Sequence, residues 1–115
     1  MNVYRKIIFH EHYFIDFYIG QTEKVQEKID YVFKVLRNVQ NVPRKFLAHI
    51  AGTDGLYEIR IEFESNIYRI FCCFDKGNLI VLFNGFQKKS QKTPRNQIEL
   101  ALKLKDEYFA TRHAN

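Results

Sequence analysis

The chain has 115 residues, of which 46% are hydrophobic and 16% aromatic. This length suits one domain over residues 1–115, and the apolar content excludes a disordered chain. The formal net charge of +5 fits a polyanion or an acidic protein as the partner.

The cysteines and the N-terminal segment indicate a reducing compartment. Cys72 and Cys73 are adjacent, and neighbours on a strand point to opposite faces, so we expect no disulfide. The first six residues, MNVYRK, lack the apolar stretch of a signal peptide, and no run approaches membrane-spanning length. We therefore expect a cytoplasmic protein that does not associate with membranes.

The first half of the chain predicts one strand and two helices. Residues 3–9 read as a strand, and residues 11–19 as a short helix that ends at Gly20. Thr22 is suited to cap a longer helix that ends before Pro43. The apolar residues of this helix recur at helical spacing and form one stripe: Val25, Ile29, Val32, Phe33, Leu36 and Val39.

The second half predicts an antiparallel meander of three strands. Residues 56–64 alternate between apolar and charged, which indicates a half-buried strand. A two-residue turn at Ser65-Asn66 leads into residues 67–74. This turn pairs Phe63 with Tyr68, Ile61 with Ile70, and Glu62 with Arg69.

A second turn, at Lys76-Gly77, leads into the third strand over residues 79–86. The same reasoning pairs Phe74, Cys72 and Ile70 with Leu79, Val81 and Phe83, and places Asn84 beside Arg69. A final helix begins with Thr93 as N-cap and Pro94 at its first position. The order of elements is typical of an α+β fold: strand, helical hairpin, three-strand meander, helix.

Between the last strand and the last helix lies a basic loop. Lys88, Lys89, Lys92 and Arg95 fall within eight positions, with no acidic residue among them. Such a loop is suited to binding phosphates. A solvent-exposed connector is the alternative interpretation.

Two arginines are expected beside this loop. The register places Arg60 and Arg69, with Glu62 and Asn84, on the face of the sheet opposite the main core. A guanidinium fork matches phosphate oxygens. The alternative is that cross-strand pairing with glutamates only stabilises the sheet, and the two roles are compatible. His49, just before the turn at residues 52–55, is within possible reach of this site, but a surface histidine is the simpler interpretation.

Other chemistry has little support in the sequence. His10 and His12 have the spacing of a two-ligand metal clasp, but no third ligand follows, so we expect no metal site. Neither a P-loop nor a dinucleotide fingerprint is present, and we expect no cofactor.

Three ordered motifs resemble those of the RelE/ParE superfamily of type II toxins, and most closely its HigB-like, phage-derived branch. They are GTDGLYEIR at residues 52–60, YRIF at 68–71 and NGFQKKSQKTP at 84–94. The resemblance spans residues 52–110 and implies the RelE-like microbial RNase fold. It further implies a toxin that cleaves mRNA in the ribosomal A site. A cognate antitoxin, a helix-turn-helix protein from the adjacent gene, would neutralise it.

The resemblance also implies roles for individual residues. In such enzymes the ribose 2′-hydroxyl attacks the adjacent phosphate, so Arg60 and Arg69 would stabilise the transition state. Lys88 and Lys89 would complete the catalytic group, with a lysine as general base. The RNA-binding residues would be Lys92, Phe86, Arg95 and His49, with Phe86 stacked on a base.

Two points stay open at this stage. Some relatives use a histidine or tyrosine near the C-terminus for proton transfer, and here only Tyr108 is a candidate. The superfamily also contains ParE-like inhibitors of DNA gyrase, so a gyrase inhibitor or a catalytically inactive RNA-binding relative is the alternative function.

Overall fold

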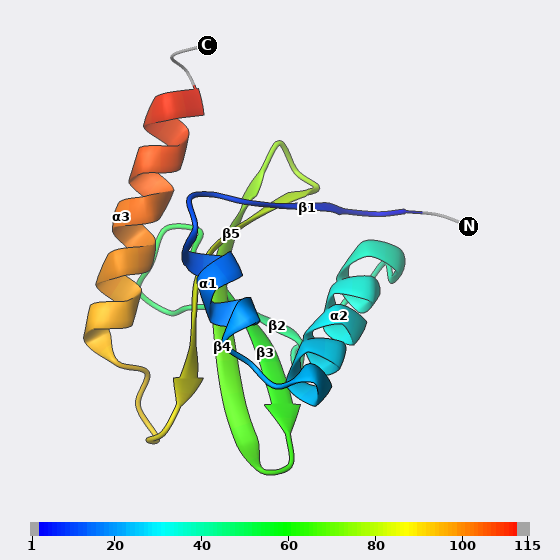
Figure 1. Cartoon of the computed structure of the whole chain (residues 1–115). Helices are drawn as coiled ribbons and strands as arrows, with labels where there is room; N and C mark the ends of the chain where they lie inside the picture. The colour runs from blue at the N-terminus through cyan, green and yellow to red at the C-terminus, as the bar shows by residue number, and fades with distance from the viewer. Residues whose placement is uncertain (1–2, 113–115) are drawn as a thin grey trace.

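The computed structural model describes residues 3–112 and shows one mixed sheet with helices on both faces (Figure 1). The strands are β1 (Lys6–Phe9), β2 (Leu47–His49), β3 (Tyr57–Phe63), β4 (Asn66–Asp75) and β5 (Leu79–Lys88). The helices are α1 (Tyr13–Ile19), α2 (Glu23–Asn38) and α3 (Arg95–Arg112). The predicted α+β fold class is therefore confirmed.

The strand order is β1-β5-β4-β3-β2, which puts the meander at the centre. β1 runs parallel to β5, and the other neighbouring pairs are antiparallel. The short strand β2 was not predicted, because three residues are too few to show an alternating pattern. It pairs with the first residues of β3 and leaves the rest of that edge open.

Helix α2 forms as its sequence predicts. The Thr22 side chain accepts a hydrogen bond from the Val25 N–H at 3.3 Å, which caps the first turn. Its buried side chains, Val25, Ile29, Val32, Phe33 and Leu36, each contribute about 1.5–3 kcal/mol by leaving water. With α1 they cover one face of the sheet, where Ile59, Ile61, Ile70, Cys72, Ile80 and Leu82 complete the first core.

Helix α3 covers the opposite face, so the sheet has two cores rather than one buried and one open face (Figure 1). The second core contains Phe71, Cys73, Val81, Phe83 and Phe86 from the strands, with Ala101 and Leu104 from α3. The end of α3 is fastened to the sheet by the buried carboxylate of Asp75. Tyr108 donates a hydrogen bond to it at 2.8 Å, and Arg112 forms an ion pair with it.

The register of the first hairpin differs from the prediction. The turn lies at Glu64 and Ser65, both with positive φ (49° and 69°), one residue earlier than expected. Each residue of β3 therefore pairs two positions away from its predicted partner: Phe63 with Asn66, Ile61 with Tyr68, and Glu62 with Ile67. A shift of two keeps every side chain on its predicted face, because side chains alternate with period two.

The predicted register of the second hairpin is wrong by one residue. Asp75 pairs with Leu79 and Cys72 with Leu82, so Val81 and Phe83 lie in the second core and not beside Cys72. A shift of one moves a whole strand face, which is why these residues were assigned to the wrong side. A bulge at residues 82–85 of β5 then changes the phase again, so that Ile70 pairs with Gly85 and Arg69 with Phe86.

Gly85 allows α1 to lie close to the sheet. A Cβ atom at this position would be 2.6 Å from Cδ2 and 2.8 Å from Cγ of Phe17. We predict that Gly85→Ala lowers the free energy of unfolding by about 1–3 kcal/mol, measured by urea denaturation. Gly20→Ala is the matched control, because a Cβ there would be 3.5 Å from its nearest neighbours. Equal stability of Gly85→Ala and the wild type would contradict the close contact.

Tyr108 gives a pH test of how α3 is anchored. Burial and the hydrogen bond to Asp75 raise the pKa of Tyr108 to about 12. The neutral phenol is thus favoured in the folded state, and its contribution is fully present below the unfolded pKa of about 10. It is lost as the pH rises from 10 to 12. We predict that Tyr108→Phe costs about 1 kcal/mol at pH 8. Wild-type stability should fall more steeply than that of the variant above pH 10, and parallel curves would refute the anchoring role.

Candidate active site

Arg60 on β3 and Arg69 on β4 lie directly opposite each other and share one carboxylate. Arg60 Nε donates a hydrogen bond to Glu58 Oε2 at 2.8 Å, and Arg69 Nε lies 3.4 Å from the same oxygen. Like charges at paired positions repel, so this register requires the carboxylate between them. The predicted pairing with a glutamate is therefore present, through Glu58, and phosphate binding by the two arginines stays a prediction.

The Arg69 side chain is buried, although it was predicted to lie on a half-exposed face of the sheet. It is 7% exposed, and its Nη1 donates to the Tyr68 carbonyl oxygen at 3.2 Å. Burial lowers the pKa of Arg69; the Glu58 carboxylate opposes this shift, and neighbouring Arg60 adds to it. Arg69 Nε is itself buried and makes no hydrogen bond, and the nearby Glu58 oxygen, 3.4 Å away, provides its charge partner.

The basic end of β5 lies on the same face. Phe86 pairs with Arg69 and Lys88 pairs with Ile67. Lys88 therefore lies two residue pairs beyond Arg69, with its side chain on the same face of the sheet. A hollow of about 390 Å³ adjoins this part of the sheet and is lined by Ile67, Lys88, Lys89, Ser90 and Gln91. The structure thus pairs two of the four predicted catalytic residues, Arg60 and Arg69, and places Lys88 and Lys89 in a separate hollow further along the sheet.

Of the predicted RNA-binding residues, two lie exposed in or beside the basic loop. The carbonyl oxygen of Lys92 accepts a hydrogen bond from the Ser90 hydroxyl at 2.9 Å, which leaves the ammonium group to solvent. Arg95 begins α3, and its Nε lies 3.2 Å from Glu99 Oε1. Its side chain is 92% exposed. Both positions remain accessible to a phosphate.

The other two predicted RNA-binding residues are placed differently. Phe86 is 9% exposed, and its ring packs 5.4 Å from that of Phe71 in the second core, which is a packing position. His49 pairs with Tyr57 on the α2 face, opposite Arg60, and its ring stands at 73° to the Tyr57 ring. His49 was expected within reach of the arginines; β2, which was not predicted, places it on the other face.

Two further residues also lie away from the arginines. Asn84 was expected beside Arg69, but the β5 bulge turns it to α3, where its Nδ2 donates to Gln97 Oε1 at 2.9 Å. Tyr108 is bound to Asp75 at the far end of β4, six residues from Arg69, or roughly 20 Å along the strand. Tyr108 is therefore not a proton-transfer group for this site.

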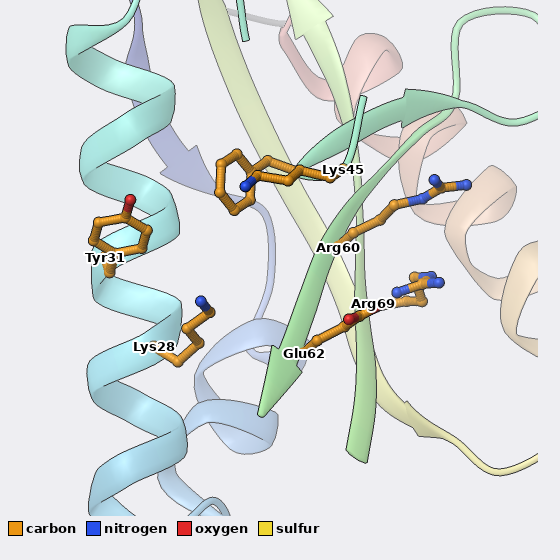
Figure 2. Close-up of a pocket in the computed structure, with 7 residues that line it drawn as sticks. Lys28, Tyr31, Lys45, Arg60, Glu62 and Arg69 are labelled. Carbon is orange, nitrogen blue, oxygen red and sulfur yellow. The ribbon is translucent and has the colours of Figure 1, made fainter. Parts of the chain in front are cut away.

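Sequence reasoning missed a hollow at the open edge of β3, which we call the β3-edge hollow. It has a volume of about 420 Å³ and is lined by Lys28, Tyr31, Lys45, Phe46, Arg60, Glu62 and Arg69. Figure 2 shows Lys28 and Tyr31 on α2, across from β3, with the Lys28 side chain directed toward the strand and the Arg60 and Arg69 side chains pointing away from α2. Lys28 and Tyr31 lie on α2 three positions apart, a helical-face pair that is a usable signal, but nothing in the sequence places them beside β3.

Within residues 3–112, no group of three or more histidine, cysteine or acidic side chains is arranged to hold a metal ion. His12 Nδ1 lies 2.7 Å from Asp16 Oδ2, whereas the His10 ring packs edge-on against Phe83 and Tyr108. In the same part of the chain, no helix is long and apolar enough to cross a membrane.

Glu58 gives a test of the arginine pair. We predict that Glu58→Gln lowers the free energy of unfolding by about 3–5 kcal/mol, because it leaves two paired arginines without a carboxylate, one of them buried. Glu62→Gln, on an exposed side chain four residues along β3 from Glu58, should change stability by less than about 0.5 kcal/mol. Urea denaturation of both variants measures the difference. Similar losses in both would contradict the central role of Glu58.

Comparisons with known proteins show the fold and the family. Over 76% of this chain and 99% of the other, the structure superposes on a chain of the RelB–RelE antitoxin–toxin complex from Methanococcus jannaschii. The TM-score is 0.54 and the identity 16%, which shows a shared fold. No curated protein matches the sequence. Residues 19–106, from the end of α1 to the middle of α3, match the family described as Phage derived protein Gp49-like (DUF891), and the chain belongs to this family.

Proposed function

We propose that this chain is the toxin of a type II toxin–antitoxin system and that it cleaves translated mRNA in the ribosomal A site. The observation that carries the proposal is the pair of arginines that share Glu58, on a sheet face that continues into Lys88 and Lys89. Membership of the phage-derived Gp49-like family and the RelE-like fold support it. The motifs at residues 52–60, 68–71 and 84–94 support its HigB-like form.

The arrangement suits transfer of a phosphoryl group within RNA. The ribose 2′-oxygen forms a bond to the adjacent phosphorus as the bond from phosphorus to the next 5′-oxygen breaks, which gives a cyclic phosphate and a 5′-hydroxyl. The negative charge on the phosphate oxygens grows in the transition state. Arg60 and Arg69 are held by Glu58 before the substrate arrives, so they stabilise that charge without reorganising.

Lys88 and Lys89 have two proposed tasks. They hold the phosphates on either side of the cleaved bond, and one of them takes the proton from the 2′-hydroxyl and returns it to the 5′-oxygen. Lys92 and Arg95, both exposed, extend the basic surface along the RNA backbone. Phe86 and His49 have no direct part, since one is in the second core and the other on the opposite face.

The proposed partner is a cognate antitoxin, a helix-turn-helix protein from the adjacent gene. The chain's net charge of +5 and its exposed lysines favour an acidic contact surface on that protein, since complementary charge speeds association. The structural neighbour from Methanococcus jannaschii is itself an antitoxin–toxin complex, which agrees with this partner class.

A gyrase inhibitor that does not cut RNA is the second candidate function. One observation favours it. Neither His49 nor Tyr108, the residues with side chains most often used for proton transfer, lies beside the arginines. Such a protein would use the same basic surface for binding alone.

Induction of the protein alone tests the proposal. We predict that growth stops and that translated transcripts show cuts inside their reading frames by primer extension. Arg60→Ala should lower the cleavage rate on the order of 10²-fold, because it removes one cationic stabiliser of the transition state. Arg60 is the residue to change, since its side chain is 31% exposed and less tied to stability than that of Arg69.

Two controls complete this experiment. Arg37→Ala removes an exposed arginine from the last turn of α2 and should leave cleavage unchanged. Arg60→Lys keeps the charge without the fork and should fall between the wild type and Arg60→Ala. Intact transcripts with accumulating DNA breaks would refute the ribonuclease and support the gyrase inhibitor.

A further inference from the structure

The β3-edge hollow combines two aromatic rings with two lysines, and the proposed active site does not use any of the four. The Tyr31 and Phe46 rings meet edge to face, with centroids 6.2 Å apart and an interplanar angle of 73°. Lys28 Nζ lies 5.3 Å from the centre of the Tyr31 ring, and Lys45 Nζ lies 4.9 Å from that of Phe46. Each ring is thus in cation–π contact with one lysine.

This group is unusually open to solvent for aromatic side chains. Tyr31 is 51% exposed, and Lys45 is also exposed. Tyr31 lies outside both cores, so packing does not account for its ring. Phe46 is partly buried against the first core, which holds it in place for contact from the solvent side.

The hollow is continuous with the arginine pair. Arg60 and Arg69 line it together with the four residues from α2 and the segment before β2. The Arg60 N–H donates to the Phe46 carbonyl oxygen at 2.8 Å, which fixes the position of Phe46 next to β3. The pairing of β2 with β3 ends at Ile59, so residues 60–63 of β3 have no strand beside them on this edge.

The positive charge and the aromatic rings of the hollow indicate an anionic ligand that contains a planar ring. Two lysines and two arginines outnumber Glu62 and the Glu58 carboxylate that pairs with the arginines, so the lining is positively charged. Cationic groups interleaved with aromatic rings are the combination that binds single-stranded nucleic acid, through the phosphates and the faces of the bases. The volume of about 420 Å³ lies within the range of small-ligand sites, roughly 300–1,000 Å³.

We propose that the β3-edge hollow binds a nucleotide of single-stranded RNA next to the one held by Arg60 and Arg69. The base stacks on Tyr31 with the edge of Phe46 beside it, and Lys28 and Lys45 contact the flanking phosphates. The inference rests on the proposed function in taking RNA as the ligand. It adds a second binding position on the opposite side of the β3 edge from Lys88 and Lys89.

The present contacts of the two lysines are compatible with this role. An exposed ammonium group gains less from an aromatic face than a stacked base does. A base therefore displaces Lys28 from the Tyr31 ring, and the freed ammonium group stays close enough to meet a phosphate. In the absence of RNA, the two lysines contact the faces of the rings on which a base would stack.

The test is binding of short RNA that the protein cannot cut. Labelled 2′-O-methyl RNA oligonucleotides of two to six nucleotides are titrated with the full-length protein at fixed salt, and anisotropy is recorded. For the wild type we expect affinity to rise as the oligonucleotide grows long enough to reach the hollow. Tyr31→Ala should remove that gain, with about 10-fold weaker binding of the longer RNA and unchanged binding of the dinucleotide.

Matched variants separate stacking from charge. Tyr31→Phe keeps the ring and should bind as the wild type does. Lys28→Gln and Lys34→Gln each remove one positive charge from α2, but Lys34 does not line the hollow. Lys28→Gln should therefore weaken the longer RNA more than Lys34→Gln does.

The outcomes distinguish this inference from the proposed function. If affinity rises with oligonucleotide length and this rise depends on Tyr31, the hollow is an RNA site, whether or not cleavage is observed. Tyr31→Ala that binds every length as the wild type does overturns the inference, and cleavage that depends on Arg60 would still stand. Absence of any RNA binding overturns it as well. Loss of the antitoxin complex with unchanged RNA binding would show a protein interface instead.

Discussion

Burial of β4 on both faces is the constraint on which the rest of the structure depends. Ile70 and Cys72 face α2, while Phe71 and Cys73, the residues between and beside them, face α3. A strand buried in this way cannot change its register by one residue without exchanging the two cores. The neighbours β3 and β5 must therefore fit to β4, and the positions of the arginines follow from that fit.

The arginine pair is a product of the same register. Arg60 and Arg69 meet because Ile59 pairs with Ile70 in the first core, one step along the hairpin. Two arginines at paired positions would repel each other. Glu58, on the same strand as Arg60, compensates this repulsion because its carboxylate pairs with both guanidinium groups. Stability and anion binding are thus linked, since the carboxylate that permits the fold also directs both Nε groups and leaves an excess of positive charge.

The sequence predicted most helices and strands, because their patterns are local. The cap at Thr22 and the alternation in β3 depend only on near neighbours. The faces of Arg60 and Arg69 were also predicted correctly, since the pairing register of the first hairpin was in error by two residues. Loop length in the second hairpin, the β5 bulge and the direction of His49 depend on tertiary pairing, and no local pattern records them. The β3-edge hollow joins α2 to β3 across the fold, so only the structure shows it.

The bulge in β5 decides which side chains lie at the tip of the sheet. On one side of it the strand must satisfy β1 and both cores, and on the other side it carries Lys88 into the basic loop. One additional residue between these two parts changes which side chains face each core, so that Phe86 still enters the second core and Gly85 still lies against Phe17 of α1. A single strand therefore contributes side chains to both cores along its length and still ends with Lys88 on the same face as Arg69, at the tip of the sheet.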